Sequence, residues 1–261
     1  MLLNYDRAGR GEPLVLIHGL GGRRQVWEPV LDQLTAEREV VTLDLPGFGD
    51  APIPPPAGTS AGIESLTRLV SDFLDELALE RPHLAGNSLG GWISLELAKR
   101  GRARSVTALS PAGFYTSREA RFTRASLRLA VRVARLLAPR ADRLLVSPLA
   151  RTLVFSQFVA HPRRISPADA AASIRALAGV PWFDETLLAV THDSFHAGGL
   201  ISVPVTIAWA EKDRVLLPRQ ARRAAHAIPG ARLVTLQHCG HVPMSDDPDQ
   251  VARVLLEGSS D

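Results

Sequence analysis

A serine stands between small residues in the segment GNSLGG, residues 86–91. A serine hydroxyl is a weak nucleophile until a base removes its proton, so a nucleophilic serine must project from the backbone to where a base can reach it. A sharp turn from a strand into a helix does this, and it needs small residues two positions to either side, here Gly86 and Gly90. Residues 83–85 have strand character and residues 92–99 helix character. The pattern therefore predicts Ser88 as a nucleophile.

A glycine-rich segment near the N-terminus suits the stabilisation of negative charge. The sequence HGLGG, residues 18–22, follows a predicted strand at residues 14–17. A flexible turn there could aim a backbone N–H at a developing oxyanion. We expect the amides of Leu20 and Leu89 to be the two donors, the second assisted by the start of a helix after Ser88. His18 and Gly19 are predicted to support the turn.

A carboxylate and a histidine each follow a later predicted strand. Asp213 stands just beyond residues 203–209, and His241 follows the strand predicted at residues 233–236. A histidine oriented by a carboxylate is the usual base for a serine nucleophile. Glu211 is a weaker candidate for the same carboxylate, and Cys239 is expected to be a small packed residue rather than a second nucleophile.

These residues require a fold that places the ends of several strands together. Short Val, Ile and Leu runs alternate with segments of helical spacing, which predicts an α/β fold with a doubly wound, mainly parallel sheet. Ligand sites in such folds lie at the carboxyl ends of the strands. The alternation breaks between residues 112 and 199, so we expect a core of residues 1–111 and 200–261 with an inserted, mostly helical cap or lid at 112–199.

Five motifs in this order resemble those of the α/β-hydrolase superfamily: HGLGG, DLPGFGDAP (44–52), GNSLGG, WAEKDRVL (209–216) and CGHVPMSDDP (239–248). The resemblance runs from about residue 14 to residue 256 and is weak across the insertion. It implies that Ser88 is the nucleophile, His241 the general base and acid, and Asp213 the residue that orients His241. Two features depart from the pattern: only residues 2–8 are available for the first edge strand, and Asp50 stands where relatives usually have serine.

The resemblance implies a hydrolase that needs no cofactor, and carboxylic ester hydrolysis is the first expectation. Epoxide hydrolases and haloalkane dehalogenases of this fold carry an aspartate nucleophile, so Ser88 argues against both activities. Carbon–carbon bond hydrolysis of a diketone-like ring-fission product is the main alternative, because Asn87 resembles what several such enzymes carry before the serine. Thioester hydrolysis and cofactor-free perhydrolysis would use the same residues.

Two readings from other classes are weaker. His192 and His196 have a spacing that could bind zinc from one helix face, but Gly198 and Gly199 follow at once and no third ligand is evident. A non-catalytic binding protein on the same scaffold normally lacks a member of the triad, and none is missing here. Because the two histidines lack a third ligand, we predict no metal.

The insertion is rich in aromatic and basic residues. Its first predicted helix has arginines on one side and apolar residues on the other, which predicts that the apolar side packs down and the arginines face water. The arginines are Arg118, Arg121, Arg124, Arg128, Arg132 and Arg135, and the apolar residues are Phe122, Leu129, Val133 and Leu137. An anionic membrane would be an alternative neighbour for such a helix. Some aromatic residues of the insertion, and the residue before the serine, are expected to contact a largely apolar substrate: Asn87, Phe114, Phe155, Phe158, Trp182 and Phe183.

Composition limits the partners. The chain has 261 residues and 46% hydrophobic content, and residues 112–181 carry a net charge of +9 against −6 elsewhere. No nucleic-acid motif accompanies these arginines. No apolar run approaches the roughly 20 residues needed to span a membrane, and no leader pattern begins the chain. We expect a cytoplasmic protein that acts on a small molecule, with no nucleic acid and no stable membrane anchoring. The sequence does not indicate an oligomeric state.

Overall fold

The structure, a computed structural model, describes residues 3–49 and 62–260. Seven strands form one sheet in the order β1-β3-β2-β4-β5-β6-β7. β1 pairs antiparallel with β3, and the other pairings are parallel. This confirms the predicted doubly wound, mainly parallel sheet. The short N-terminal segment forms the edge strand that its length had left in doubt. The strands are β1 (Tyr5–Gly9), β2 (Pro13–Ile17), β3 (Glu39–Leu43), β4 (His83–Asn87), β5 (Ser105–Leu109), β6 (Val205–Ala210) and β7 (Arg232–Leu236).

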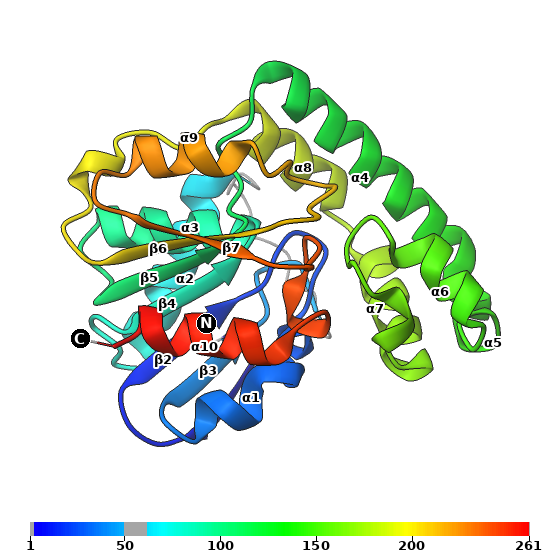
Figure 1. Cartoon of the computed structure of the whole chain (residues 1–261), viewed down its shortest axis with the longest axis horizontal. Helices are drawn as coiled ribbons and strands as arrows, with labels where there is room; N and C mark the ends of the chain where they lie inside the picture. The colour runs from blue at the N-terminus through cyan, green and yellow to red at the C-terminus, as the bar shows by residue number, and fades with distance from the viewer. Residues whose placement is uncertain (1–2, 50–61, 261) are drawn as a thin grey trace.

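Helices cover both faces of the sheet (Figure 1). α1 (Glu28–Thr35) and α10 (Pro248–Gly258) lie on one face. The other face carries α2 (Ile63–Glu76), α3 (Leu89–Lys99) and α9 (Gln220–Ala227). Every residue of β4, β5 and β6 is buried, because helices shield these central strands on both sides. The sheet is therefore a rigid platform whose loops at the carboxyl ends of the strands carry the predicted site.

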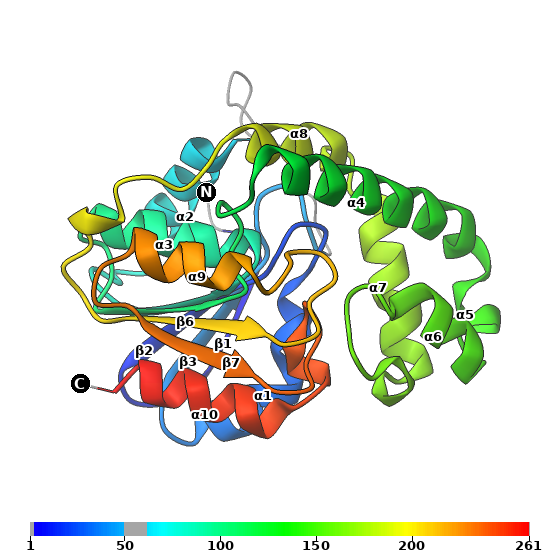
Figure 2. The same ribbon diagram turned by 45° about the horizontal axis from the view of Figure 1, so that its top comes forward.

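Five helices lie between β5 and β6, in the region predicted as an insertion. They form a unit beside the carboxyl ends of the strands (Figure 2), with a core of its own that includes Ala134, Leu145, Phe155 and Ile174. We call residues 112–199 the insertion. Its helices are α4 (Ser117–Leu137), α5 (Ala141–Leu144), α6 (Pro148–Phe155), α7 (Pro167–Gly179) and α8 (Phe183–His192). Short 3₁₀ turns occur at Arg24–Trp27, Ala138–Arg140, Pro162–Arg164, Gly198–Leu200 and Pro243–Ser245.

The prediction of which side of α4 is buried was wrong. Phe122, Leu129 and Val133 are exposed, although the pattern placed them against the protein. The buried side of α4 carries Thr123 and Ala134, together with Ala120 and Val131. Small side chains let α4 lie close to α7 and α8, so the larger apolar residues are left outside. In the part of the chain that the structure describes, no helix is long and apolar enough to cross a bilayer.

A buried carboxylate ties the start of α4 to α9. Glu119 forms a capping box with Thr116 and also accepts hydrogen bonds from Arg219 and Arg223. Burial alone would raise the pKa of Glu119, but the hydrogen bonds from Thr116 and Arg219 outweigh it and lower the pKa below the ordinary 4.5. The ionised carboxylate therefore stabilises the folded protein above that ordinary pKa, and this stability is lost as the pH falls through the lowered value.

Glu119→Gln is expected to reduce the free energy of unfolding at pH 7 by about 2 kcal/mol, because hydrogen bonds to a charged group are lost. Thermal unfolding followed by circular dichroism measures this as a drop of roughly 5 °C. Glu185→Gln is the matched control, since Glu185 lies exposed on α8. The difference between wild type and Glu119→Gln should shrink in acid, and a difference that stays constant down to about pH 3 would contradict the assignment.

Candidate active site

Ser88 lies on a strained turn between β4 and α3. Its backbone angles are φ 56° and ψ −113°, a combination that residues other than glycine rarely adopt. A Cβ on Gly86 would lie 2.2 Å from the carbonyl of Gly90, and a Cβ on Gly90 would lie 2.1 Å from the oxygen of Ile17. Only glycine fits at either position. The turn therefore has the geometry that the spacing GNSLG predicts.

The loop after β2 lies directly against this turn. A Cβ on Gly19 would be 3.1 Å from the Cβ of Ser88. The buried His18 holds the loop, since its Nδ1–H donates to the Gly19 oxygen at 2.7 Å and its Nε2 accepts from the Leu45 amide at 2.9 Å. Burial lowers the pKa of His18, which keeps the imidazole neutral and suits this pair of bonds. These two bonds place His18 so that it holds the loop, and its role as a support of the oxyanion turn stays a prediction.

The two predicted oxyanion donors flank Ser88. Leu20 and Leu89 line the same cavity as Ser88. Leu89 is the first residue of α3, where a helix leaves its backbone amides without acceptors of its own. The positive end of the helix dipole lies at the same place. These amides could therefore receive a negative oxygen next to Ser88, and their assignment as the oxyanion hole remains a prediction.

Asp213 and His241 form a buried pair. His241 Nδ1 lies 2.7 Å from Asp213 Oδ2, and the other carboxylate oxygen accepts hydrogen bonds from the amides of Val215 and Leu216, each at 2.8 Å. These bonds fix the carboxylate, so His241 donates from Nδ1 and keeps Nε2 free. Ser88 and His241 line one cavity. The structure thus brings the three predicted catalytic side chains to one place.

The competing residues are engaged elsewhere. Glu211 accepts a hydrogen bond from the His238 amide at 2.7 Å, outside the pair formed by Asp213 and His241. Cys239 is fully buried in the core. Burial, reinforced by the charge of Asp246, raises the pKa of its thiol to about 12, so it is not a thiolate at neutral pH. Asp213 remains the candidate acid, and Cys239 is a packed residue as expected.

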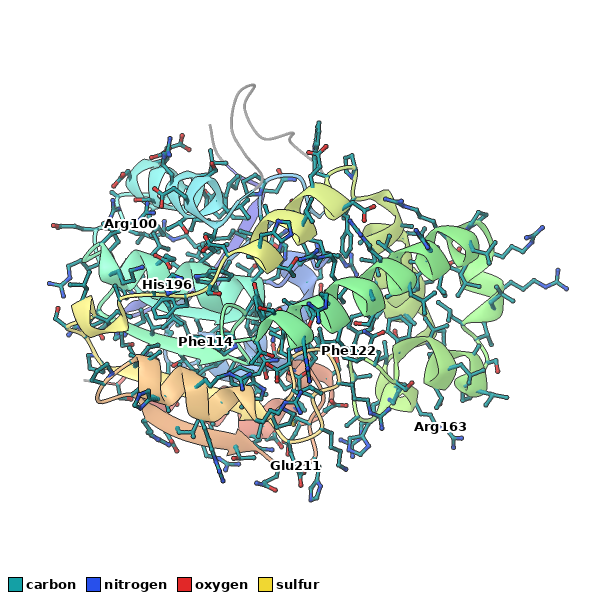
Figure 3. All side chains as sticks on the ribbon, turned by 90° about the horizontal axis from the view of Figure 1, so that it is seen from above. Arg100, Phe114, Phe122, Arg163, His196 and Glu211 are labelled. Atoms are coloured by element: carbon teal, nitrogen blue, oxygen red, sulfur yellow. The ribbon has the colours of Figure 1, made fainter. Side chains whose placement is uncertain are left out.

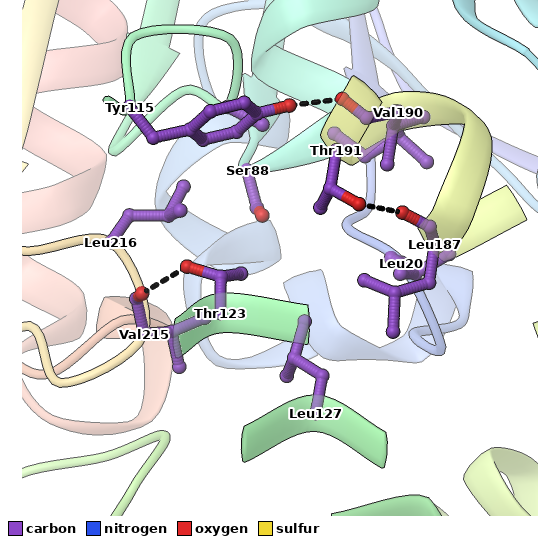
Figure 4. A pocket seen from close by; sticks show the side chains of 12 residues that line it. Leu20, Ser88, Tyr115, Thr123, Leu127, Leu187, Val190, Thr191, Val215 and Leu216 are labelled. Carbon is purple, nitrogen blue, oxygen red and sulfur yellow. Dashed lines mark hydrogen bonds between the residues drawn. The ribbon is translucent and has the colours of Figure 1, made fainter. Parts of the chain in front are cut away.

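A cavity of about 330 Å³, including the part open to solvent, lies between Ser88 and the insertion (Figure 4). Besides Ser88, three residues with hydroxyl groups line it, and each of these three already donates to a backbone carbonyl: Tyr115 to Val190, Thr123 to Val215 at 3.0 Å, and Thr191 to Leu187 at 2.6 Å. The hydroxyl hydrogens are therefore not available to a ligand. The rest of the lining is apolar: Leu20, Leu89, Ala112, Leu127, Leu187, Val190, Val215 and Leu216.

A second cavity of about 420 Å³, again partly open, adjoins the first at Ser88. The two share Leu20, Ser88, Leu127 and Val215, so a bound molecule could extend to both sides of the serine. The lining of the second cavity also includes Gly19, Gly22, Val26, Asn87, Phe158, His241 and Val242. Because His241 faces this side, a leaving group that takes its proton would lie here.

The residues predicted to contact substrate are distributed differently. Asn87 and Phe158 line the second cavity. Of the other four, Phe114 and Phe183 are buried in the core on the sheet, Phe155 is in the core of the insertion and Trp182 is half-buried before α8. None of these four lines either cavity. Tyr115, Thr123, Leu127, Leu187 and Val190 were not predicted to line the site, and their only signal in the sequence is the four-residue spacing of Thr123 and Leu127 on one side of α4.

The side-chain amide of Asn87, which lines the second cavity, also joins two segments of the protein. It donates to the carbonyl of Leu109 at 3.2 Å and to that of His241 at 2.9 Å. Both amide hydrogens are thus used, and the bond to His241 joins the serine turn to residues 237–247, which we call the histidine loop. Asn87 therefore holds the backbone of His241.

The positions of His192 and His196 do not support the hypothesis of a zinc site. His192 is the last residue of α8, and His196 lies beyond the helix, so the two do not share a helix face. Both are exposed. Within residues 3–49 and 62–260, no three side chains of the metal-binding types are grouped so as to hold an ion.

The insertion is bonded to the histidine loop. Asp246, buried in that loop, accepts hydrogen bonds from the amides of Ala160, His161 and Gly240 at 2.7–2.8 Å. The Val242 amide also donates to the Phe158 carbonyl at 2.8 Å. The Asp246 carboxylate therefore binds both the backbone of the insertion at residues 160–161 and the backbone next to His241.

Asp246→Asn is expected to lower kcat/KM on the order of 10- to 100-fold, because a small displacement of His241 is enough to impair proton transfer. An amide has one acceptor oxygen, and its NH₂ group would face a backbone N–H that now donates to Asp246. Steady-state kinetics with a soluble ester measures the loss. Asp247→Asn is the matched control, since Asp247 caps α10 and asparagine caps a helix equally well. Equal losses in the two variants would contradict a specific role of Asp246.

Comparisons with known proteins identify the family of the chain. The model of the "Alpha/beta hydrolase family" matches residues 14–254. The chain is 37% identical over 192 residues to "Epoxide hydrolase EphH" of Mycobacterium tuberculosis, covering 70% of this chain and 87% of that protein. It is 30% identical over 249 residues to "Putative carbamate hydrolase RutD" of Pseudomonas savastanoi pv. phaseolicola, covering 94% and 92%.

Among solved structures, a thermophilic esterase from Thermogutta terrifontis matches with a TM-score of 0.73 at 21% identity, covering 98% of this chain and 92% of that one. At this identity the likeness concerns the fold. Residues 50–52 of the motif DLPGFGDAP, including Asp50, lie outside the residues that the structure describes. The match of the family model over most of the sequence, with the sheet order and the serine turn described above, shows that the chain belongs to the alpha/beta hydrolase family.

Proposed function

We propose that this hydrolase cleaves a carboxylic ester through an acyl-enzyme on Ser88. The observation that carries the proposal is the buried bond of Asp213 to His241, with Ser88 strained outward into the same cavity. His241 Nε2 removes the proton of Ser88, and Ser88 Oγ attacks the ester carbonyl. The amides of Leu20 and Leu89 receive the oxyanion. His241 then gives the proton to the leaving alcohol, and water releases the acid in the second half of the reaction without a cofactor.

The cavity suggests the substrate class. Its lining around Ser88 is largely apolar, and the hydroxyl groups of Tyr115, Thr123 and Thr191 are bonded to the protein. Burial of apolar groups contributes about 25 cal/mol per Å², so such a lining favours a small to medium apolar acyl group. The described lining of both cavities contains no Lys or Arg, which disfavours a carboxylate on the substrate.

The same lining argues against carbon–carbon cleavage of an anionic ring-fission product. That alternative relied on Asn87, whose amide hydrogens are bonded to Leu109 and His241. The epoxide hydrolase name belongs to a relative, and a serine stands at the nucleophile position here. Thioesters would use the same residues as esters, so the test includes them.

The experiment compares turnover of one set of substrates by wild type and Ser88→Ala. The set holds nitrophenyl esters of acetate, butyrate, hexanoate and hemisuccinate, a matched thioester, an aryl epoxide and a dienone acid. We expect neutral short to medium esters to give the highest kcat/KM, the hemisuccinate to be at least tenfold slower, and the epoxide to be inert. Faster turnover of the dienone acid than of any ester would overturn the proposal, and faster turnover of the thioester would change the substrate class.

A further inference from the structure

The outer side of α4 carries large apolar side chains in contact with solvent. Phe122, Leu129, Val133 and Leu136 are separated by seven, four and three residues, so they share one side of the helix. Leu136 is 75% exposed. Figure 3 looks onto α4 from above and labels Phe122 on it. This side is opposite the one that contributes Thr123 and Leu127 to the cavity at Ser88.

A second group of exposed apolar residues follows directly along the chain. Leu144, Val146, Leu149 and Leu153 belong to α5, α6 and the turn between them, and Leu153 is 74% exposed. Residues 122–153 thus hold eight of the eleven large apolar side chains that are exposed in the described part of the chain. Such a concentration of exposed apolar side chains in one segment of the chain, which runs from α4 to α6, indicates an interaction site. We call these eight residues the apolar surface of the insertion.

Exposed arginines accompany the apolar surface. Arg118 and Phe122, like Arg132 and Leu136, are four residues apart and therefore neighbours on α4. In contrast to Arg128, which pairs with Asp184, six exposed arginines make no ion pair with any residue in the described ranges. They are Arg118, Arg121, Arg132, Arg135, Arg140 and Arg143.

Exposed apolar side chains together with exposed arginines favour one kind of partner over another. A second copy of the chain, placed with the same surface in contact, would bring both sets of arginines together, and like charges at an interface disfavour association. Apolar side chains beside unpaired arginines instead complement a layer with anionic groups outside and hydrocarbon beneath, which is an anionic lipid surface. Each basic residue near such a surface strengthens binding roughly fivefold.

We propose that the apolar surface and its arginines dock the insertion on an anionic lipid bilayer. The contact is peripheral and reversible, since α4 is too polar to cross the membrane. The proposal does not depend on the ester substrate, because it concerns binding of the protein to lipid and can be measured without turnover.

Co-sedimentation with vesicles tests the proposal. Wild type is compared on phosphatidylcholine alone and on phosphatidylcholine with about a third phosphatidylglycerol. We expect at least tenfold tighter binding to the anionic vesicles, and weaker binding in high salt because surface charges are screened. Arg121→Gln with Arg132→Gln and Arg135→Gln should weaken it on the order of 100-fold. Leu129→Ser with Leu136→Ser and Leu153→Ser should weaken it at least tenfold.

Matched controls separate the surface from overall charge and hydrophobicity. Arg68→Gln with Arg222→Gln and Arg253→Gln removes three exposed arginines of the core, and Leu200→Ser with Leu233→Ser removes exposed leucines outside the apolar surface. Circular dichroism and turnover of a soluble ester check that every variant is folded. Failure of wild type to bind either vesicle, or equal losses in the controls, would overturn the proposal. So would a dimer in light scattering that the leucine variant dissociates, since a second copy would then cover this surface.

Discussion

Ser88→Ala is expected to lower kcat/KM for esters by about 10⁶-fold and to abolish covalent labelling by a fluorophosphonate. The variant removes the protein atom that forms the acyl-enzyme bond in the proposed mechanism. It leaves the turn intact, because alanine needs the same space and Gly86 and Gly90 already determine the backbone there. KM should change little if the aliphatic cavity supplies most of the binding.

Intact-mass spectrometry after labelling measures this directly. Wild type should gain one adduct, and Ser88→Ala and His241→Ala none. Ser117→Ala is the control, because Ser117 is an exposed residue at the start of α4 and should be labelled like wild type. An adduct that persists in Ser88→Ala, or a folded wild type that takes up no label and turns over no ester, would contradict the proposed nucleophile.

Asp213→Asn is expected to lower kcat on the order of 10³- to 10⁴-fold with little effect on KM. The amides of Val215 and Leu216 would hold the asparagine oxygen where they now hold Oδ1. The asparagine NH₂ would then face Nδ1 of His241 and require that nitrogen to be the acceptor. The proton would move to Nε2, which could no longer take the proton of Ser88.

Steady-state kinetics and the rate of fluorophosphonate labelling both report this loss. Glu211→Gln is the matched control, because it removes a carboxylate two residues away that bonds to the His238 amide. Its kcat should stay within about twofold of wild type. A larger loss in Glu211→Gln than in Asp213→Asn would reassign the acid.

The sequence was sufficient for the sheet and for the placement of the three proposed catalytic residues. Runs such as residues 40–43 and 106–109 are apolar at three of four positions, as suits strands covered on both faces, and the structure has β3 and β5 there. The serine turn was predictable because its sterics restrict positions 86 and 90 to glycine. Local rules of this kind do not depend on distant contacts.

The packing of the insertion was harder to predict, because more than one side of its helices could be buried. α4 has one stripe of large apolar residues and another of small ones, and hydrophobic periodicity alone favours the larger. The helix buries Ala120, Thr123 and Ala134 instead, since close approach to α7 and α8 requires small side chains. Phe114 and Phe183 were likewise assigned to substrate, although an aromatic residue fills a core as readily as a pocket.

The bonding of Asp246 and Phe158 across the two parts of the chain limits how this enzyme can be redesigned. Insertions are attractive units to exchange between related enzymes when new specificity is wanted. Here residues 158–161 supply one carbonyl and two amides that the histidine loop needs. A chimaera that replaces residues 112–199 as a block would therefore remove these bonds together with the pocket lining, whereas one that keeps residues 156–164 would retain them.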